Sequence, residues 1–404
     1  MIGNGIAIKR YVPPAARAVD PPKFVQFGGR TISCGAVLFL ACAIYADSGR
    51  ARPVVYNRIF FAVPDAFHAR RDQSFAPRSS RLGRKLKLMI KTFVTTTSSR
   101  ALEPRLARRR RIETQQRSSW KGRARSGYRL WHDRLMAAVL KSTLQITGLY
   151  ERGVANALHP VVRHLRLGFV ELPPALDGFR ILHLSDLHID AMDGLAEILA
   201  EQILDLPVDL CVLTGDYRFE ISGPCHAVYP RMRRILGSIR SRHGVVGILG
   251  NHDCADIAVE LEKAGVRMLI NEAVAVGSPD SCLWVIGVDD PHYYGCDDLI
   301  GALDGAPDES FKLLLAHTPE IFEEATQAGI DLYLTGHTHA GQICLPWLGP
   351  VVLHARCPRP YAHGHWHHAR MQGYTTSGVG CSLLPVRFHC PAEIAVIELA
   401  RTAG

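Results

Sequence analysis

Five short apolar runs beyond residue 178 each end in aspartate, asparagine or histidine. They read FRILHLSDLH, VDLCVLTGD, GVVGILGNHD, FKLLLAHTP and DLYLTGHTH, in this order, between residues 179 and 339. Apolar runs of this length, bounded by glycine or polar residues, predict buried strands. Helix-compatible stretches at 191–205, 255–264 and 319–329 separate several of them. This alternation predicts an α/β fold, in which ligands bind beyond the carboxyl ends of the strands.

The polar residues that follow the apolar runs are of types that bind metal ions. They are Asp186, His188, Asp216, Asn251, His317, His337 and His339. Mixed imidazole, carboxylate and amide ligands suit Mn, Fe or Zn, and Mg less well, and a set without cysteine argues against a structural zinc site. Seven ligands are too many for one ion that keeps an open position. They predict two divalent ions that share a carboxylate, an arrangement used for displacement at phosphorus.

The turn GHTH at 336–339 places two histidines two positions apart. Taken alone, this pair is also typical of an ordinary surface turn. With the other four motifs present, we expect the turn to deliver one imidazole toward each ion. We also expect Gly336 to be glycine because the backbone bends tightly there.

The order D-x-H, G-D, G-N-H-D, a lone histidine and G-H-T-H resembles the calcineurin-like metallophosphoesterase superfamily over residues 166–400. The stretches LSDLHI, LTGDY, GILGNHDC, GVDDP and GHTHAGQI, and the segment 376–399, are similar to its YkuE- and YaeI-like bacterial phosphodiesterase branch. One departure is Ala340, where that branch usually has glycine. The resemblance implies a two-sheet β-sandwich flanked by helices.

The resemblance also implies a role for each motif residue. One ion would be held by Asp186, His188 and His339, the other by Asn251, His317 and His337, and Asp216 would bridge them. A metal-bridging hydroxide would attack phosphorus, and His252 would protonate the leaving oxygen or stabilise the equatorial charge, with Asp253 orienting His252.

The first 150 residues differ in charge from the rest of the chain. They hold 29 Lys and Arg against 7 Asp and Glu, a net +22, whereas the remaining residues hold 18 against 31, a net −13. Residues 70–130 are rich in Arg, Ser and Thr and show no apolar period, which indicates disorder. We predict a basic, largely disordered extension over 1–129, a helical connector over 130–165 and the catalytic domain over 166–404. A chain that begins near Leu130 is therefore expected to fold and to be active.

An uncharged run at 31–46 is shorter than the stretch of about 20 residues that spans a bilayer. A signal anchor, a signal peptide and a buried segment all remain open for it. The first 150 residues are basic, and apolar residues recur loosely after Leu130. An anionic membrane surface is therefore a candidate partner of the N-terminal region. We expect a cytoplasmic location, with membrane association as an open alternative.

These observations predict a phosphodiesterase that hydrolyses a small or lipid-linked phosphodiester or pyrophosphate. A nuclease of the same superfamily is the alternative, but the net charge of −13 in the catalytic part disfavours nucleic acid as a partner. A non-catalytic scaffold ranks last. Scaffold members usually lose ligands or the histidine of G-N-H, whereas this chain keeps His252 and all seven ligands.

Several further residues are weaker candidates. The tract HGHWHH, which contains His363 and His368, favours an exposed loop over a metal site. Four residues have two interpretations each: contact with the phosphate or leaving group, or an ordinary surface role. They are Arg218, Tyr293, Tyr294 and Arg387.

Overall fold

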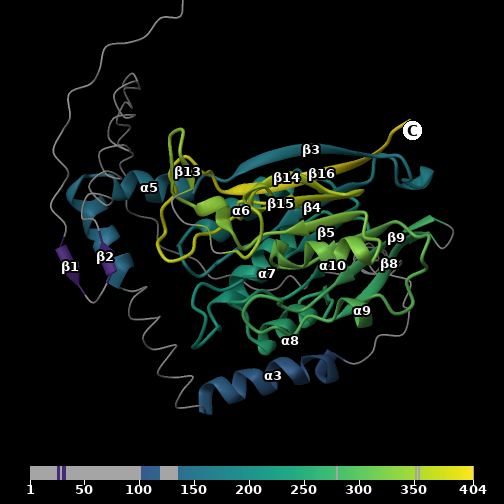
Figure 1. The fold of residues 1–404 in the computed structure, drawn as a ribbon, viewed down its shortest axis with the longest axis horizontal. Coiled ribbons are helices and arrows are strands. Elements are labelled where there is room, and N and C mark those ends of the chain that lie inside the picture. Colours follow the sequence, from purple (N-terminus) through teal and green to yellow (C-terminus); the bar gives the residue numbers. More distant parts are fainter. Residues whose placement is uncertain are drawn as a thin grey trace, which may run out of the picture.

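The computed structural model describes the short strands β1 (Val25–Phe27) and β2 (Arg30–Ile32) and then residues 102–118, 135–278, 281–350, 353 and 355–403. Most of the predicted extension and nearly all of the run at 31–46 lie outside these ranges. Within them, two six-stranded sheets form the body of the protein, as Figure 1 shows. No helix of the described part is both long and apolar enough to cross a bilayer.

The first sheet has the strand order β3–β16–β4–β5–β6–β7. Its strands are β3 (Val161–Phe169), β16 (Glu393–Arg401), β4 (Arg180–Leu184), β5 (Leu210–Leu213), β6 (Val245–Gly247) and β7 (Val266–Met268). Strands β4 to β7 run parallel to one another, whereas β16 runs antiparallel to β4. All four residues of β5 are buried. Burial on both faces explains why these strands read as continuous apolar runs rather than alternating patterns.

The second sheet has the order β14–β15–β11–β10–β9–β8. Its strands are β14 (Gly364–His368), β15 (Met371–Thr375), β11 (Leu332–Thr335), β10 (Lys312–Leu315), β9 (Ser281–Gly287) and β8 (Glu272–Ser278). The four central strands are parallel, and the two edge strands pair antiparallel to their neighbours.

The two sheets face each other across an apolar core that includes Ile181, Val212 and Leu313. Helices α6 (Leu195–Leu204), α7 (Val228–Ser238) and α8 (Ala255–Lys263) cover the outer face of the first sheet. The short helices α9 (Leu299–Ala302) and α10 (Phe322–Gln327) cover the second. The predicted sandwich of two sheets flanked by helices is confirmed.

The predicted helical connector contains a helix at 135–146 and helix α5 (Tyr150–Ala157). Both helices contribute to one small apolar cluster, which also contains Val386 and Phe388. Strand β3 begins at Val161, so the last residues of the predicted connector belong to the first sheet. The sandwich therefore begins earlier than the predicted boundary at residue 166.

Helix α3 (Leu102–Ser118) falls in the region predicted to be disordered, yet it packs beside α8, as Figure 1 shows. Leu106 and Arg109 are fully buried against the rest of the protein. Arg105 forms an ion pair with Glu272. The prediction of disorder is wrong for residues 102–118. The helix is held largely by arginines paired with acidic residues, and such pairs leave no apolar period in the sequence.

A chain that begins at residue 130 should therefore be less stable than one that begins at residue 101. Loss of α3 leaves the carboxylate of Asp289, which is 1% exposed, without its arginine partner. An unpaired buried charge costs about 3–5 kcal/mol, which lowers the melting temperature of a domain of this size by about 10 °C. Calorimetry of the two chains measures the difference. Equal melting temperatures would contradict a stabilising role for α3.

Candidate metal centre

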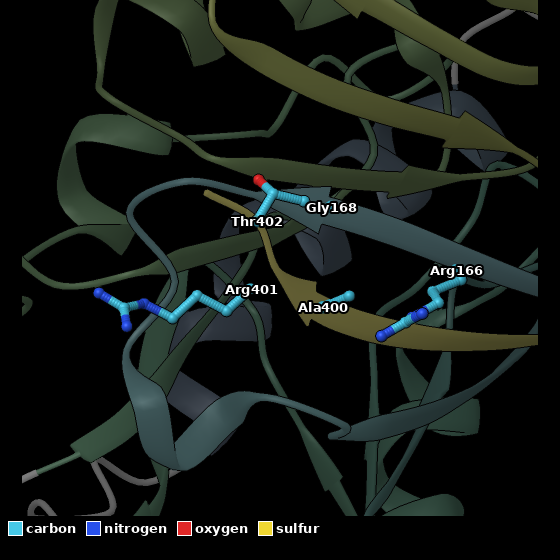
Figure 2. Close-up of a pocket in the computed structure, with 5 residues that line it drawn as sticks. All are labelled: Arg166, Gly168, Ala400, Arg401 and Thr402. Carbon is cyan, nitrogen blue, oxygen red and sulfur yellow. The ribbon is translucent and has the colours of Figure 1, made fainter. Parts of the chain in front are cut away.

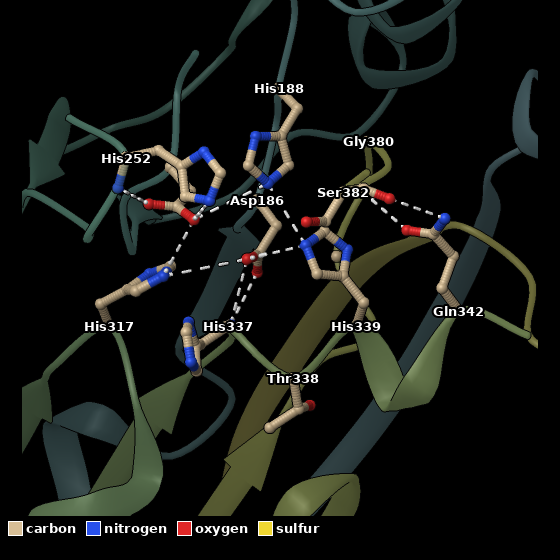
Figure 3. A network of polar contacts seen from close by, with 12 residues as sticks. Asp186, His188, His252, His317, His337, Thr338, His339, Gln342, Gly380 and Ser382 are labelled. Carbon is tan, nitrogen blue, oxygen red and sulfur yellow. Dashed lines mark hydrogen bonds and ion pairs between the residues drawn. The ribbon is translucent and has the colours of Figure 1, made fainter. Parts of the chain in front are cut away.

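The five motif loops meet at one edge of the sandwich, beyond the carboxyl ends of β4, β5, β6, β10 and β11. From the first sheet come Asp186, His188, Asp216 and Asn251, and from the second come His317, His337 and His339. Figure 3 shows the side chains of both sheets pointing into one common space. Parallel strands explain this convergence, because their carboxyl ends lie at the same edge of a sheet.

Among the described residues, imidazole and carboxylate atoms at the centre form three groups, and the atoms of each group lie within 4.8 Å of one another. The first group is Asp186, His188 and His339, and the second is Asp216, His317 and His337. The third joins His188 and Asp216 to His252, the predicted acid. In the first group, the Nε2 atoms of His188 and His339 are 3.2 Å apart. In the second, Nε2 of His317 lies 3.2 Å from Oδ2 of Asp216.

Hydrogen bonds on the far side of two rings fix which nitrogen faces the centre. Nδ1 of His188 lies 2.7 Å from the carbonyl oxygen of Arg218, and Nδ1 of His317 lies 2.7 Å from that of Thr214. A carbonyl oxygen only accepts, so each Nδ1 carries a proton and donates it. The Nε2 atoms are thereby directed at the centre, as is usual for histidines that bind metal ions.

Two buried polar atoms at the centre have no hydrogen-bond partner among the described residues. They are Oδ1 of Asn251, which is an acceptor, and Nε2 of His317, whose nearby group is the carboxylate of Asp216 at 3.2 Å. Leaving a buried acceptor unsatisfied costs about 1–3 kcal/mol, so native structures seldom do so without a reason. A bound cation would satisfy both atoms, and mixed nitrogen and oxygen donors suit a divalent ion. The residues present therefore fit the metal site that the motifs predict.

The backbone is strained at most of the predicted ligands. The φ angle lies in the left-handed region at Asp186 (50°), His188 (37°), Asp216 (56°), His337 (68°) and His339 (48°). Residues with a side chain lose about 1–2 kcal/mol in this conformation, and such residues cluster at functional sites. The fold therefore accepts strain in order to aim these side chains.

The turn GHTH approaches Asp186 closely. The backbone amide of His337 donates to both carboxylate oxygens of Asp186, at 3.1 and 3.0 Å. A Cβ atom on Gly336 would lie 2.0 Å from Oγ of Ser185. Gly336 is thus glycine because of this contact, and the tight bend that we expected is not the reason. Ala340 has a φ of 48°, so it is strained where the similar branch usually has glycine.

Burial and neighbouring charges shift the pKa values of several groups at the centre. Burial raises the pKa of Asp186 to about 6, with nearby Asp216 adding to the shift. Burial lowers the pKa of His188 to about 3. At His317 burial also acts to lower the pKa, but the carboxylate of Asp216 outweighs it and raises the pKa to about 10. A potential that favours the charged form of a buried imidazole also attracts a divalent cation.

His252 stands beside the second group and is 14% exposed. Its Nδ1 donates to the carbonyl oxygen of Phe219 at 2.5 Å, and its Nε2 lies 3.9 Å from Oδ2 of Asp216. The ring is therefore oriented by a backbone carbonyl, and its free nitrogen faces the centre.

Asp253 is fully buried and binds backbone amides. Its carboxylate accepts hydrogen bonds from the amides of Asp216, Tyr217 and Gly250 at 2.8, 2.9 and 2.8 Å. The expectation that Asp253 orients the ring of His252 is wrong, because Phe219 does so. Asp253 instead fixes the backbone of the turn that carries Asn251 and His252.

The weaker candidates have structural contacts. Arg218 is 3% exposed and donates to the carbonyl oxygens of three loop residues: Ile221, Gly223 and His252. Arg387 is fully buried and donates to the carbonyl oxygens of Ser377, Gly378 and Gly380. Neither arginine is free to bind a phosphate. Tyr294 is buried under Arg109, and Tyr293 is 39% exposed.

The histidine-rich tract forms β14 at the edge of the second sheet. His365 contacts Gln372 at 2.8 Å, and His368 contacts Tyr361 at 2.9 Å. Within the described ranges, the groups of atoms able to hold a metal ion do not include this tract.

Arg109 is the residue that the motif pattern misses. It donates to the carbonyl oxygens of Gly250 and Asp253, directly behind the predicted ligands. The run Arg108–Arg111 is typical of a solvated segment, so it gives no signal. The one available signal is its partner Asp289, which lies in the motif GVDDP.

A separate small pocket lies at the carboxyl ends of β3 and β16, as Figure 2 shows. It is lined by Arg166, Gly168, Ala400, Arg401 and Thr402. Because β16 runs antiparallel to β4, this end of the sheet lies opposite the end that carries Asp186. The pocket is therefore not part of the metal centre.

Comparison with known proteins places these motifs in a family. The family model described as calcineurin-like phosphoesterase matches residues 179–341. The metallophosphoesterase YkuE of Bacillus subtilis is 30% identical over 241 residues, which cover 57% of this chain and 82% of YkuE. The phosphodiesterase YaeI of Escherichia coli is 30% identical over 250 residues, or 59% and 87% of the two chains. A transmembrane protein with metallophosphoesterase domain from Bos taurus is 30% identical over 287 residues, which cover 65% of this chain and 62% of that protein.

A divalent ion should stabilise the protein through this centre. Adding Mn²⁺ to chelator-treated protein at about 100 times its Kd should contribute about 2.7 kcal/mol, which raises the melting temperature by about 5–10 °C. Asp216→Asn should lose most of this shift, because Asp216 faces His188 and His317. Asp193→Asn is the matched control, since the Asp193 side chain is 97% exposed. Equal shifts in all three proteins would show that the ion binds elsewhere.

Proposed function

The chain belongs to the calcineurin-like phosphoesterase family and is a metal-dependent phosphoesterase, and from this we propose that it is a phosphodiesterase with a two-ion centre. The position of Asp216 is the observation that supports two ions. Its Oδ2 lies 3.7 Å from Nε2 of His188 and 3.2 Å from Nε2 of His317. One carboxylate oxygen thus faces ligands of both groups, as a bridging ligand must.

The proposed ligand sets follow the two groups. One ion takes Asp186, His188 and His339, the other takes Asn251, His317 and His337, and Asp216 lies between them. When bound, the two ions would activate water as the nucleophile and neutralise charge that develops on the phosphate. Mn, Fe and Zn suit these ligands best, with Mg as a weaker fit.

His252 is the proposed general acid. Its Nδ1 proton is held by the carbonyl oxygen of Phe219, so Nε2 is the atom that can deliver a proton to a leaving oxygen. The side chain is partly exposed beside Asp216, where a substrate could reach it. An imidazole is suited to proton transfer near neutral pH. Asp253 supports this step by fixing the backbone on either side of the site.

A small or lipid-linked phosphodiester or pyrophosphate is the proposed substrate. A nuclease activity is the alternative within the same family. The part of the chain after residue 150 has a net charge of −13, which disfavours a polyanion because nucleic acid binding depends on neutralising phosphates.

Activity and metal content should respond differently to two substitutions. Chelator-treated protein should lose hydrolysis of bis-p-nitrophenyl phosphate, and Mn²⁺ should restore it. His252→Ala should keep its metal content while kcat falls by about 10²–10⁴-fold, the usual contribution of a general acid. Asp216→Asn should lose metal as well as activity. Elemental analysis and steady-state kinetics measure both quantities.

The control for these measurements is His226→Ala, which removes an exposed histidine and should leave both quantities unchanged. If His252→Ala strips the metal ions, the acid role is wrong and His252 is a ligand. Cleavage of single-stranded DNA faster than of small diesters would favour the nuclease.

We further propose that the chain acts at a lipid surface. At the tip of the hairpin formed by β12 (Cys344–Leu345) and β13 (Gly349–Pro350), Trp347 is 101% exposed and Leu348 is 71% exposed. Ile146, in the helix 135–146, is 87% exposed. Exposed large apolar side chains are typical of an interaction site, and tryptophan is enriched where proteins meet the bilayer interface.

This apolar surface borders the metal centre. Ile343 at the base of the hairpin and Leu144 of the helix belong to one apolar cluster. The hairpin follows Gln342. The backbone amide of Gln342 donates a hydrogen bond to the carbonyl oxygen of His339 at 2.8 Å. A substrate anchored in lipid would therefore present its phosphate near the centre. The relative from Bos taurus is named a transmembrane protein, which also favours a membrane.

Replacing the hairpin tip should weaken binding to lipid. The double variant Trp347→Ser and Leu348→Ser should bind vesicles of phosphatidylglycerol and phosphatidylcholine at least about tenfold less tightly. A tenfold loss of affinity corresponds to about 1.4 kcal/mol, and one buried large apolar side chain contributes about that much or more. Ile300→Ser is the control, because Ile300 is 79% exposed on α9, far from the hairpin in Figure 1. Sedimentation with the vesicles measures binding. Equal binding of the double variant and the unaltered protein would rule out the hairpin as the docking surface.

A further inference from the structure

We propose that Arg109 of helix α3 is a positioning residue for the metal centre. It lies behind the turn Gly250–Asp253 and holds both ends of that turn. The proposal rests on the function proposed above for Asn251 and His252, which are the two residues between those ends.

One nitrogen of the Arg109 guanidinium makes both contacts with the turn. Its Nη2 donates to the carbonyl oxygen of Gly250 at 2.5 Å and to that of Asp253 at 2.8 Å. These two carbonyl groups flank Asn251 and His252 in the sequence. A displacement of either end of the turn would therefore move a predicted ligand or the predicted acid.

The remainder of the guanidinium is fixed as well. Nη1 forms an ion pair with the carboxylate of Asp289, and the guanidinium carbon lies 3.9 Å from the centre of the Tyr294 ring. Arg109 is 0% exposed, and Asp289 is 1% exposed. The planar, forked guanidinium suits this set of partners, whereas a lysine ammonium is a point charge that cannot reproduce the fork.

The turn is held from both sides. On the side of the first sheet, the carboxylate of Asp253 accepts from the amides of Asp216 and Gly250. On the side of α3, Arg109 binds the carbonyl groups. Complementary contacts on opposite sides leave the turn little freedom, and a catalytic group held in this way keeps its geometry.

Helix α3 also supports the helix that follows the turn. Helix α8 begins at Ala255, and its N-cap residue Cys254 makes no side-chain hydrogen bond to it. Glu113 of α3 accepts from the amide of Ala255 at 2.8 Å instead. The first turn of a helix has unpaired amides, so an acceptor from another segment stabilises its start. Nε of Arg109 lies 3.8 Å from Oε1 of Glu113, and both residues contact the segment 250–255.

Arg109 does not contact the substrate side of the centre, because it is fully buried under the turn. Its removal should therefore lower kcat and leave KM nearly unchanged. A misplacement of about 1 Å at a catalytic group costs about 10²-fold in rate. This pattern differs from simple loss of stability, which reduces the amount of active protein without loosening one segment.

The test uses the full chain with Arg109→Met, Arg109→Lys and the control Arg110→Met. Arg110 lies on the same helix, is 36% exposed and pairs with Glu103 and Asp256 without touching the turn. With metal supplied and the proteins shown to be folded, Arg109→Met should lower kcat by about 10²-fold, with KM within about threefold. The kcat of Arg109→Lys should lie between those of Arg109→Met and the unaltered protein, because the ammonium keeps a charge opposite Asp289 but loses the forked geometry. The control should stay within about twofold of the unaltered protein, as is usual for an exposed pair.

Hydrogen exchange gives a readout that does not depend on activity. In Arg109→Met, loss of global stability should speed exchange throughout, but the amides of residues 250–255 should accelerate at least about tenfold more than those of β11. Unchanged kcat and unchanged exchange in the folded variant would overturn the proposal. Uniformly faster exchange, or failure of both Arg109 variants to fold, would also overturn it by showing a global structural role.

Failure of the proposed function gives a different result. In that case the unaltered protein hydrolyses no phosphodiester even with metal supplied. The exchange measurement then decides the role of Arg109 alone. A larger acceleration at residues 250–255 than at β11 supports it as the residue that holds the turn, and equal or unchanged exchange refutes it.

Discussion

The carboxylate of Asp253 makes the interaction on which the arrangement of the motif loops depends. It joins the loop after β5 to the loop after β6 through three backbone amides. The loops come so close that a Cβ atom on Gly250 would lie 2.2 Å from Oδ1 of Asp216. Only a glycine allows this approach, and the two oxygens of a carboxyl group offer enough lone pairs to accept from several amides at once. The aspartate of G-N-H-D is therefore a structural element of the centre, although its motif suggests a catalytic one.

The centre brings together groups that would each be unfavourable in isolation. Asp186, Asp216 and His317 are buried, and several of their neighbours have left-handed backbones. Burial disfavours charged side chains, and each strained residue adds to the cost. A rigid frame must hold such a set in place. Strands of two sheets provide that frame, with Arg387 and Arg109 bonded to the loop backbones around them.

Much of the fold and of the candidate site could be predicted from the sequence, because both depend on local patterns. A strand buried on both faces must be apolar along its length. The residues that follow it lie beyond the carboxyl end of the strand, at the edge of the sheet where ligands bind. The converging positions of Asp186 and His339 follow from these two facts, whereas the two-sheet sandwich was implied by the family resemblance. Their ligand roles remain predictions, since they rest on resemblance and geometry together.

Long-range pairing explains what could not be predicted. Arg109 and Asp289 lie 180 positions apart, and an arginine that is buried by a distant aspartate looks the same in sequence as one in solvent. The role of Asp253 was misjudged for a related reason, because its backbone partners carry no signal in their side chains. The reason for Gly336 was also missed, since the contact with Ser185 joins two different sheets.

The place of β16 in the first sheet has a consequence for how the protein is made. This last strand of the described chain lies between β3 and β4, and β4 leads directly to Asp186. During synthesis, residues 393–401 leave the ribosome after every predicted ligand has already emerged. The sheet is closed only when this strand inserts, and pairing over such a separation is slow compared with local folding. The first sheet is therefore completed from its centre outward by a strand that is synthesised after every predicted ligand.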